Sequence, residues 1–192
     1  MTKTNGNKIP SRAECDELMA RYSMLPNIVE HSIQVMNVSL AITDNLKSGV
    51  TINRDLVIAA ALLHDITKTK SLLTKERHDE SGGLLLRELG FPSTACIVEQ
   101  HVIIHNVNLE GRLEEREIVY YADKRVLHDT IVNIEERLND LIQRYGTTEE
   151  IRNLIRINKT QVLAVERKIA GFMSIDLQGA IQAIADWSRK NS

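Results

Sequence analysis

Histidines and aspartates with metal-binding chemistry recur through the first 130 residues of the chain. His64 and Asp65 stand side by side at the end of the apolar run AAALLHD. His31 and Asp123 lie where the apolar periodicity of their own segments predicts an inward-facing side chain. Burying an imidazole or a carboxylate costs several kcal/mol unless something pairs with it. A shared divalent cation removes that cost, so the four residues together indicate a metal site.

The types of these residues restrict the metal. A mixed shell of imidazole nitrogens and carboxylate oxygens suits octahedral Mn, Fe, Co, Mg or Ni better than a closed tetrahedral zinc site built from cysteines. Two carboxylates balance the charge of the cation, and such a shell leaves coordination positions open to water. We therefore expect one or two divalent ions beside exchangeable solvent.

Helix capping signals and apolar spacing predict an all-α fold that positions these residues. Ser11 and Glu14 form a capping box for a helix to about residue 22, and Pro26 opens a long helix through His31 that closes near Gly49. Asn53 caps a third helix that runs into the HD pair. Further helices are expected at 80–89 before Gly90, from Ser93 through His101, at 112–127, 133–145 and 148–173, and from Ser174 onward.

The character of the chain changes near residue 130, because every histidine precedes that point. We expect an N-terminal leader and helix at 1–23, a core at 24–130, and a C-terminal helical extension at 131–192 packed on the core. Amphipathic helices with arginines fill the extension. The simplest interpretation of these arginines is a solvated face, or packing and dimer contacts, and phosphate binding by one of them is the less favoured alternative. They are Arg137, Arg144, Arg152, Arg156 and Arg167.

Composition excludes several classes of partner. The net charge is −2 and only 4% of residues are aromatic, so nothing favours nucleic-acid binding. Cys15 and Cys96 show no CxxC spacing, the N-terminus has no apolar secretion signal, and no apolar stretch approaches the length of a membrane span. We expect a cytoplasmic protein, with a homodimer through the last helices as the one protein partner to consider.

The order of these residues resembles the H…HD…D signature of the HD-domain superfamily of metal-dependent phosphohydrolases. HDITK at 64–68 is similar to the family's HDIGK form, and HDESGG at 78–83 resembles its H-x-x-x-G-A segment. The resemblance covers about residues 24–130 and implies an HD-domain-like helical bundle with additional C-terminal helices. Thr67 replaces the usual glycine, and Gln100 stands where a cyclic-di-GMP phosphodiesterase of the HD-GYP branch has a first histidine, which disfavours that activity.

The resemblance also implies roles for individual residues. The first metal would be held by His31, His64, Asp65 and Asp123. In two-metal members Asp65 would bridge the ions, with His78 and His101 as ligands of the second. His105 lies one turn beyond His101 and would face the substrate if that helix continues. Lys68 would act beside Asp65 in catalysis and contact a phosphate. The alternative for Lys68, and likewise for Lys124 and Arg125, is a solvated side chain at a helix end without a role in the site.

The implied activity is hydrolysis of a phosphate ester or anhydride, in a nucleotide or other small phosphorylated metabolite, by a metal-activated water. Two alternatives remain at this stage. The first is a dinucleoside polyphosphate hydrolase with a two-metal site. The second is a regulatory HD domain that binds without turnover.

Overall fold

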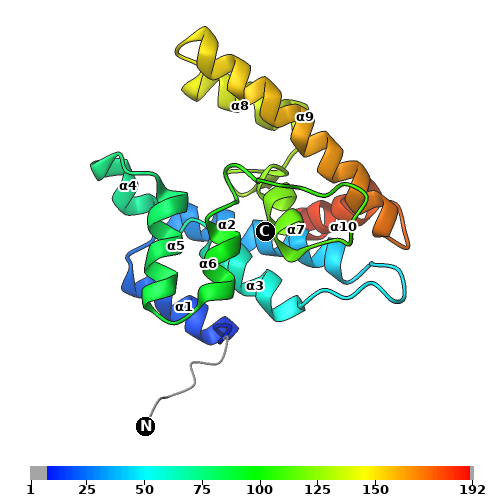
Figure 1. Ribbon diagram of the computed structural model, residues 1–192, viewed down its shortest axis with the longest axis horizontal. Helices are drawn as coiled ribbons and strands as arrows, with labels where there is room; N and C mark the ends of the chain where they lie inside the picture. The colour runs from blue at the N-terminus through cyan, green and yellow to red at the C-terminus, as the bar shows by residue number, and fades with distance from the viewer. Residues whose placement is uncertain (1–7, 191–192) are drawn as a thin grey trace.

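The computed structural model describes residues 8–190, which form a bundle of helices with one short β-hairpin (Figure 1). The predicted all-α fold is confirmed. The elements in chain order are α1 (Arg12–Arg21), α2 (Pro26–Thr43), α3 (Arg54–Leu63), α4 (Lys68–Thr74), α5 (His78–Glu88), α6 (Pro92–Val98), α7 (Glu115–Asp123), β1 (Val126–Leu127), β2 (Thr130–Ile131), α8 (Ile134–Tyr145), α9 (Glu149–Phe172) and α10 (Leu177–Lys190).

Several helices begin where the capping residues predict. Ser11 Oγ accepts from the Glu14 N–H, and the Glu14 carboxylate accepts from the Ser11 N–H at 2.9 Å, which completes the expected capping box. Pro26 is the first residue of α2, where its missing N–H costs nothing. The Asn53 side chain accepts from the Leu56 N–H at 3.1 Å and starts α3.

Two expected boundaries are wrong. Helix α2 ends at Thr43 rather than near Gly49, which takes a left-handed φ of 88° in the loop that follows. The cap of α10 is Asp176, which accepts from the Gly179 N–H at 2.6 Å. Ser174, the expected cap, instead donates to the Asn45 carbonyl.

The segments around His101 and Asp123 also differ from expectation. Helix α6 ends at Val98, so His101 lies in the bend beyond it rather than on a helix. Helix α7 covers only part of 112–127, and a hairpin pairs Val126 with Ile131 in antiparallel register. The turn of this hairpin contains His128 at a left-handed φ of 56°. Both strands of the hairpin contact α2.

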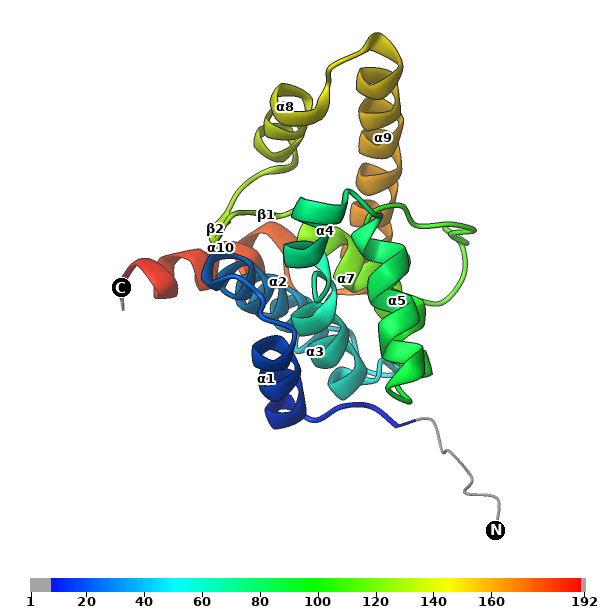
Figure 2. The same ribbon diagram turned by 90° about the vertical axis from the view of Figure 1, so that its left-hand side faces the viewer.

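The core is built on α2, α3 and α7, which pack against one another, while α6 packs on α3 and α5 packs on α6. Residues 59–63 in the C-terminal half of α3 and residues 118–122 of α7 are fully buried, which explains the continuous apolar character of these stretches. Helix α10 lies against α2, and the C-terminal half of α9 reaches α7. Helix α8 and the N-terminal half of α9 project from this body as a pair (Figures 1 and 2).

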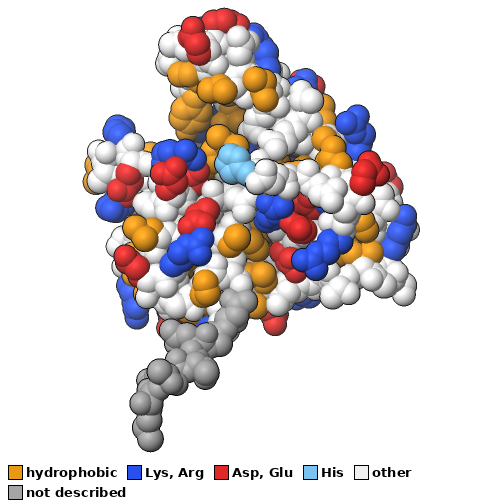
Figure 3. All heavy atoms as spheres, viewed as in Figure 1, with side chains coloured by type: hydrophobic (Ala, Val, Ile, Leu, Met, Phe, Trp, Pro, Cys, Tyr) orange, Lys and Arg blue, Asp and Glu red, His pale blue; other side chains and the backbone are white. Residues whose placement is uncertain are grey.

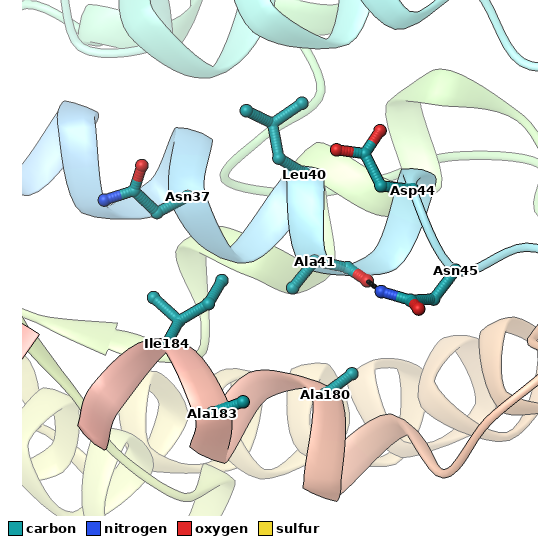
Figure 4. Close-up of a pocket in the computed structure, with 8 residues that line it drawn as sticks. All are labelled: Asn37, Leu40, Ala41, Asp44, Asn45, Ala180, Ala183 and Ile184. Atoms are coloured by element: carbon teal, nitrogen blue, oxygen red, sulfur yellow. Dashed lines mark hydrogen bonds between the residues drawn. The ribbon is translucent and has the colours of Figure 1, made fainter. Parts of the chain in front are cut away.

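A cavity of about 400 Å³ opens between α2 and α10 (Figure 4). Asn37, Leu40 and Asp44 line it from α2, and Ala183 and Ile184 line it from α10. None of the predicted metal ligands borders it. Among the described residues, no helix is both long and apolar enough to cross a membrane.

Candidate metal centre

The four predicted first-metal ligands meet in the interior of the bundle. His31 lies in the second turn of α2, His64 is the C-cap of α3 with Asp65 next to it, and Asp123 is the last residue of α7. All four are buried, with His64 0% and Asp65 1% exposed. The end of α3 therefore brings His64 and Asp65, and the end of α7 brings Asp123, toward the His31 ring on α2.

The distances within this first group suit a common ion. His31 Nε2 lies 3.1 Å from Asp123 Oδ1, and His64 Nε2 lies 3.7 Å from the same oxygen. Asp65 Oδ2 is 3.4 Å from His64 Nε2 and 4.0 Å from His31 Nε2. One ligand atom each from His31, His64 and Asp65 fall within 4.8 Å of one another.

A second group shares Asp65 with the first. Asp65 Oδ1 lies 3.2 Å from His78 Nε2 and 3.5 Å from His101 Nε2, and these two nitrogens are 3.2 Å apart. The ligand atoms of the three residues again lie within 4.8 Å of one another. The carboxylate of Asp65 thus presents one oxygen to each group, which is the arrangement of a bridging ligand.

Main-chain carbonyls fix three of the histidine rings. The Nδ1 atom of each ring lies 2.7 Å from a main-chain carbonyl oxygen. The partner of His31 is the His128 carbonyl, that of His64 is the Ala61 carbonyl, and that of His101 is the Val98 carbonyl. A carbonyl oxygen only accepts, so each Nδ1 carries a hydrogen and donates it. In the neutral ring the lone pair is then on Nε2, the nitrogen that points into the cluster, which is the arrangement found around metal-ligating histidines.

These lone pairs face other acceptors, and this is the strongest sign of a cation. His64 Nε2 and Asp65 Oδ1 are buried and have no hydrogen-bond partner. Burial lowers the pKa of His101 to about 4, which keeps its ring neutral and its Nε2 basic. Buried acceptors that face one another are costly unless a positive charge lies between them. The residues present therefore fit one or two divalent metal ions.

Two lysines hold the carboxylates ionised. Lys68 Nζ lies 2.7 Å from Asp65 Oδ2, and Lys124 Nζ lies 2.6 Å from Asp123 Oδ2. Burial alone would raise the pKa of each carboxyl, but the lysine and the neighbouring histidines hold both pKa values well below the usual range. Lys124 also donates to the His101 carbonyl at 2.7 Å and so ties the two groups together. It is 5% exposed, which rules out the solvated helix end for this lysine.

Thr67 acts on the site through its hydroxyl rather than through its backbone. Its φ of −101° is ordinary, so the glycine of the family pattern is not needed here for conformation. The hydroxyl donates to the His78 carbonyl at 2.9 Å and lies 2.9 Å from Ser81 Oγ. Thr67 therefore attaches the start of α5, and with it His78, to the turn that carries Asp65.

The structure does not bring His105 into either group. The helix that would have placed it one turn from His101 ends at Val98, and the His105 side chain is exposed. Its carbonyl accepts from Arg116 Nη1 at 2.7 Å, which fixes the loop rather than the ring. The His128 side chain is exposed, but its carbonyl, which the residue type could not reveal, orients His31.

Comparison with known proteins agrees with this geometry. The HD domain family matches residues 28–159, well over half of the chain, and the protein belongs to that family. A stretch of 51 residues is 45% identical to the dihydroneopterin 2',3'-cyclic phosphate phosphodiesterase of Methanocaldococcus jannaschii. This stretch is 26% of the chain and spans only 20% of that relative. No solved structure matched the chain.

Proposed function

We propose that this protein is a metal-dependent phosphohydrolase that cleaves a phosphate ester or anhydride in a nucleotide or other small phosphorylated metabolite. The observation that carries the proposal is the convergence of four imidazole Nε2 atoms with the carboxylates of Asp65 and Asp123. Membership of the HD domain family and the cyclic phosphodiester in the name of the M. jannaschii relative support it.

The chain's own residues would divide the work. His31, His64, Asp65 and Asp123 would hold one divalent ion. Such an ion lowers the pKa of a bound water and neutralises phosphoryl oxygens during attack. Lys68, with 31% of its side chain exposed, is paired to Asp65 yet open to solvent, so we assign it contact with a phosphate oxygen.

The bridging position of Asp65 favours two ions over one. His78 and His101 would complete the second, and the His78 side chain is 25% exposed where the substrate would enter. A two-ion site also suits the alternative substrate, a dinucleoside polyphosphate. Figure 3 shows hydrophobic side chains gathered on the underside of the projecting pair of helices.

Activity and metal content of the same samples test the proposal. The protein is stripped with chelator, reloaded with Mn, Fe, Co, Mg or Ni in turn, and given 2',3'-cyclic nucleotides, mononucleotides, dinucleoside polyphosphates and sugar phosphates. We expect ester cleavage with at least one ion and about two ions bound per chain. Asp65→Asn should lose both ions and activity, since it removes the shared charge.

Asp44→Asn is the matched control, because it removes one negative charge from an exposed aspartate that pairs with Arg54. It should keep both metal and activity. Full metal content without cleavage of any substrate would overturn the enzymatic proposal in favour of a regulatory HD domain. Wild-type turnover by Asp65→Asn would remove the metal centre from the reaction altogether.

A further inference from the structure

The hydroxyl of Thr67 connects two helices instead of capping its own. Thr67 is the N-cap of α4, a position where a threonine side chain usually accepts a hydrogen bond from a backbone N–H of the first turn. Among the described residues, no such bond forms at this helix start. The side chain is buried and donates to the His78 carbonyl of α5 at 2.9 Å. The hydroxyl thus fixes the start of α5 rather than the start of α4.

The single hydrogen of this hydroxyl gives the contact a direction. The His78 carbonyl can only accept, so the Thr67 hydrogen goes to it. Ser81 Oγ lies 2.9 Å from Thr67 Oγ1 and must then be the donor to Thr67. Both ends of this short chain of hydrogen bonds, Ser81 and His78, lie in the first turn of α5. Thr67 therefore holds that turn at two points.

Gly82 gives α5 room to approach Thr67. A Cβ at Gly82 would lie 3.1 Å from Val98 Cγ1 of α6 and 3.4 Å from Thr67 Oγ1, so a side chain there would press on Val98 and touch Thr67. Without it, α5 packs on both α4 and α6 (Figures 1 and 2). The first glycine of the HDESGG segment and the threonine of HDITK are therefore complementary in shape.

His78 depends on this contact more than the other histidines of the cluster do. Their three rings are each oriented by a main-chain carbonyl, and within the described part of the chain no such bond reaches the His78 ring. Arg77, the N-cap of α5, makes no side-chain capping bond there either. The place of His78 Nε2, 3.2 Å from Asp65 Oδ1, therefore follows from where α5 begins, and the Thr67 hydroxyl fixes that start.

We infer that Thr67 is a positioning residue for the second metal ion, because its hydroxyl holds His78 beside Asp65 at a distance that a shared ion can span. The inference rests on the proposed function and deepens it, since it assigns the affinity of one ion position to a residue that is not itself a ligand. The hydroxyl makes no printed contact with the first group, so the affinity for the first ion does not depend on it. The glycine of the family pattern could not make this contact.

Calorimetric titration of the chelator-stripped protein with Mn²⁺ measures the two binding steps without any substrate. Thr67→Val keeps the shape of the side chain and removes the hydroxyl. It should weaken the second step about 10- to 100-fold, the usual effect of removing an outer partner of a metal ligand, and leave the first step unchanged. Thr67→Ser keeps the hydroxyl and should bind both ions nearly as tightly as the wild type.

Thr94→Val is the matched control. Thr94 is fully buried on α6, and its Oγ1 has no hydrogen-bond partner among the described residues. The same substitution there removes a hydroxyl that makes no such contact, so both binding steps should stay as in the wild type. A general loosening of the interior would instead change metal binding in both valine variants.

Amide hydrogen exchange of the metal-free protein gives a second readout. The Ser81 N–H donates to the Arg77 carbonyl at 3.0 Å in the first turn of α5, and its exchange should be faster in Thr67→Val than in Thr94→Val. Thr67→Ala replaces Thr67→Val if the latter does not fold. The inference is overturned by unchanged exchange at Ser81, by a second step that is as tight as in the wild type, by equal weakening of both steps, or by a wild type that binds one ion. Turnover tests the proposed function separately, since a protein that binds two ions through Thr67 but cleaves nothing would contradict only that function.

Discussion

The buried ion pair between Lys168 of α9 and Glu117 of α7 gives a sharp test of how the C-terminal helices are attached to the core. Lys168 Nζ lies 2.7 and 2.8 Å from the two Glu117 oxygens, and these side chains are 2% and 0% exposed. The same ammonium donates to the Asn108 carbonyl at 2.8 Å. A single side chain thus connects α9, α7 and the loop that follows His101.

Lys168→Met removes the cation but leaves Glu117 buried. Breaking a buried pair in this way costs about 3–5 kcal/mol, because the remaining charge is uncompensated. For a chain of this size that corresponds to a fall in Tm of about 6–20 °C. Glu117 would then still accept the Glu114 N–H in the cap of α7, at 2.9 Å, but no cation.

Urea unfolding of the metal-free protein, followed by circular dichroism, measures the change. Adding Glu117→Gln to Lys168→Met should recover part of the loss, because a neutral amide is cheaper to bury than an unpaired carboxylate. Lys159→Met is the control on the same helix. Its partner Glu135 is 65% exposed, so the cost should stay under about 1 kcal/mol. Equal effects of Lys168→Met and Lys159→Met would refute the assignment of Lys168 as the anchor of α9.

Three further predictions concern the rest of the chain. Burial raises the pKa of the Cys15 thiol to about 12, so a thiol reagent should label the native protein once, at the exposed Cys96, and Cys96→Ser should abolish labelling. Asp176→Ala should cost about 1 kcal/mol in urea unfolding because it removes the cap of α10. Hydrogen bonds from Lys8 and Ser11 lower the pKa of Glu14 from 4.5 to about 2, so its stabilisation is complete above about pH 4.5 and lost as pH falls toward 2. Glu14→Gln should flatten the stability profile in that window, and an unchanged profile would contradict the low pKa.

The helical class and the cluster of candidate metal ligands could be predicted because both leave local patterns. Capping side chains mark the starts of α1 and α3, and Pro26 marks the start of α2. The apolar run before His64 places the His64–Asp65 pair at a helix end. His78 and His101 came from the family resemblance, and the structure places both beside Asp65. How many ions these residues bind is still a prediction.

What the sequence could not predict depends on contacts between distant segments. The sequence shows no strong helix breaker after Val98, where α6 ends, so the helix could be expected to continue and to turn His105 toward the site. The loop that follows α6 does not orient His105 in that way. The carbonyl of His128 reaches His31 only because a two-residue hairpin turns there, and backbone acceptors leave no mark on residue type. Arg137 looks like a surface residue in an amphipathic helix until the fold buries it.

The carbonyl bonds to His31, His64 and His101 have a consequence for how metal preference can change. Because main-chain carbonyls orient these rings, we expect substitutions of the surrounding side chains to leave the direction of the rings intact, so that a bound ion would meet ligands already in position. Among the described residues, His78 alone of the four lacks such a bond, and its ring is the most open to water. Exchange of ions, and any drift of selectivity between related proteins, should therefore begin at the His78 edge.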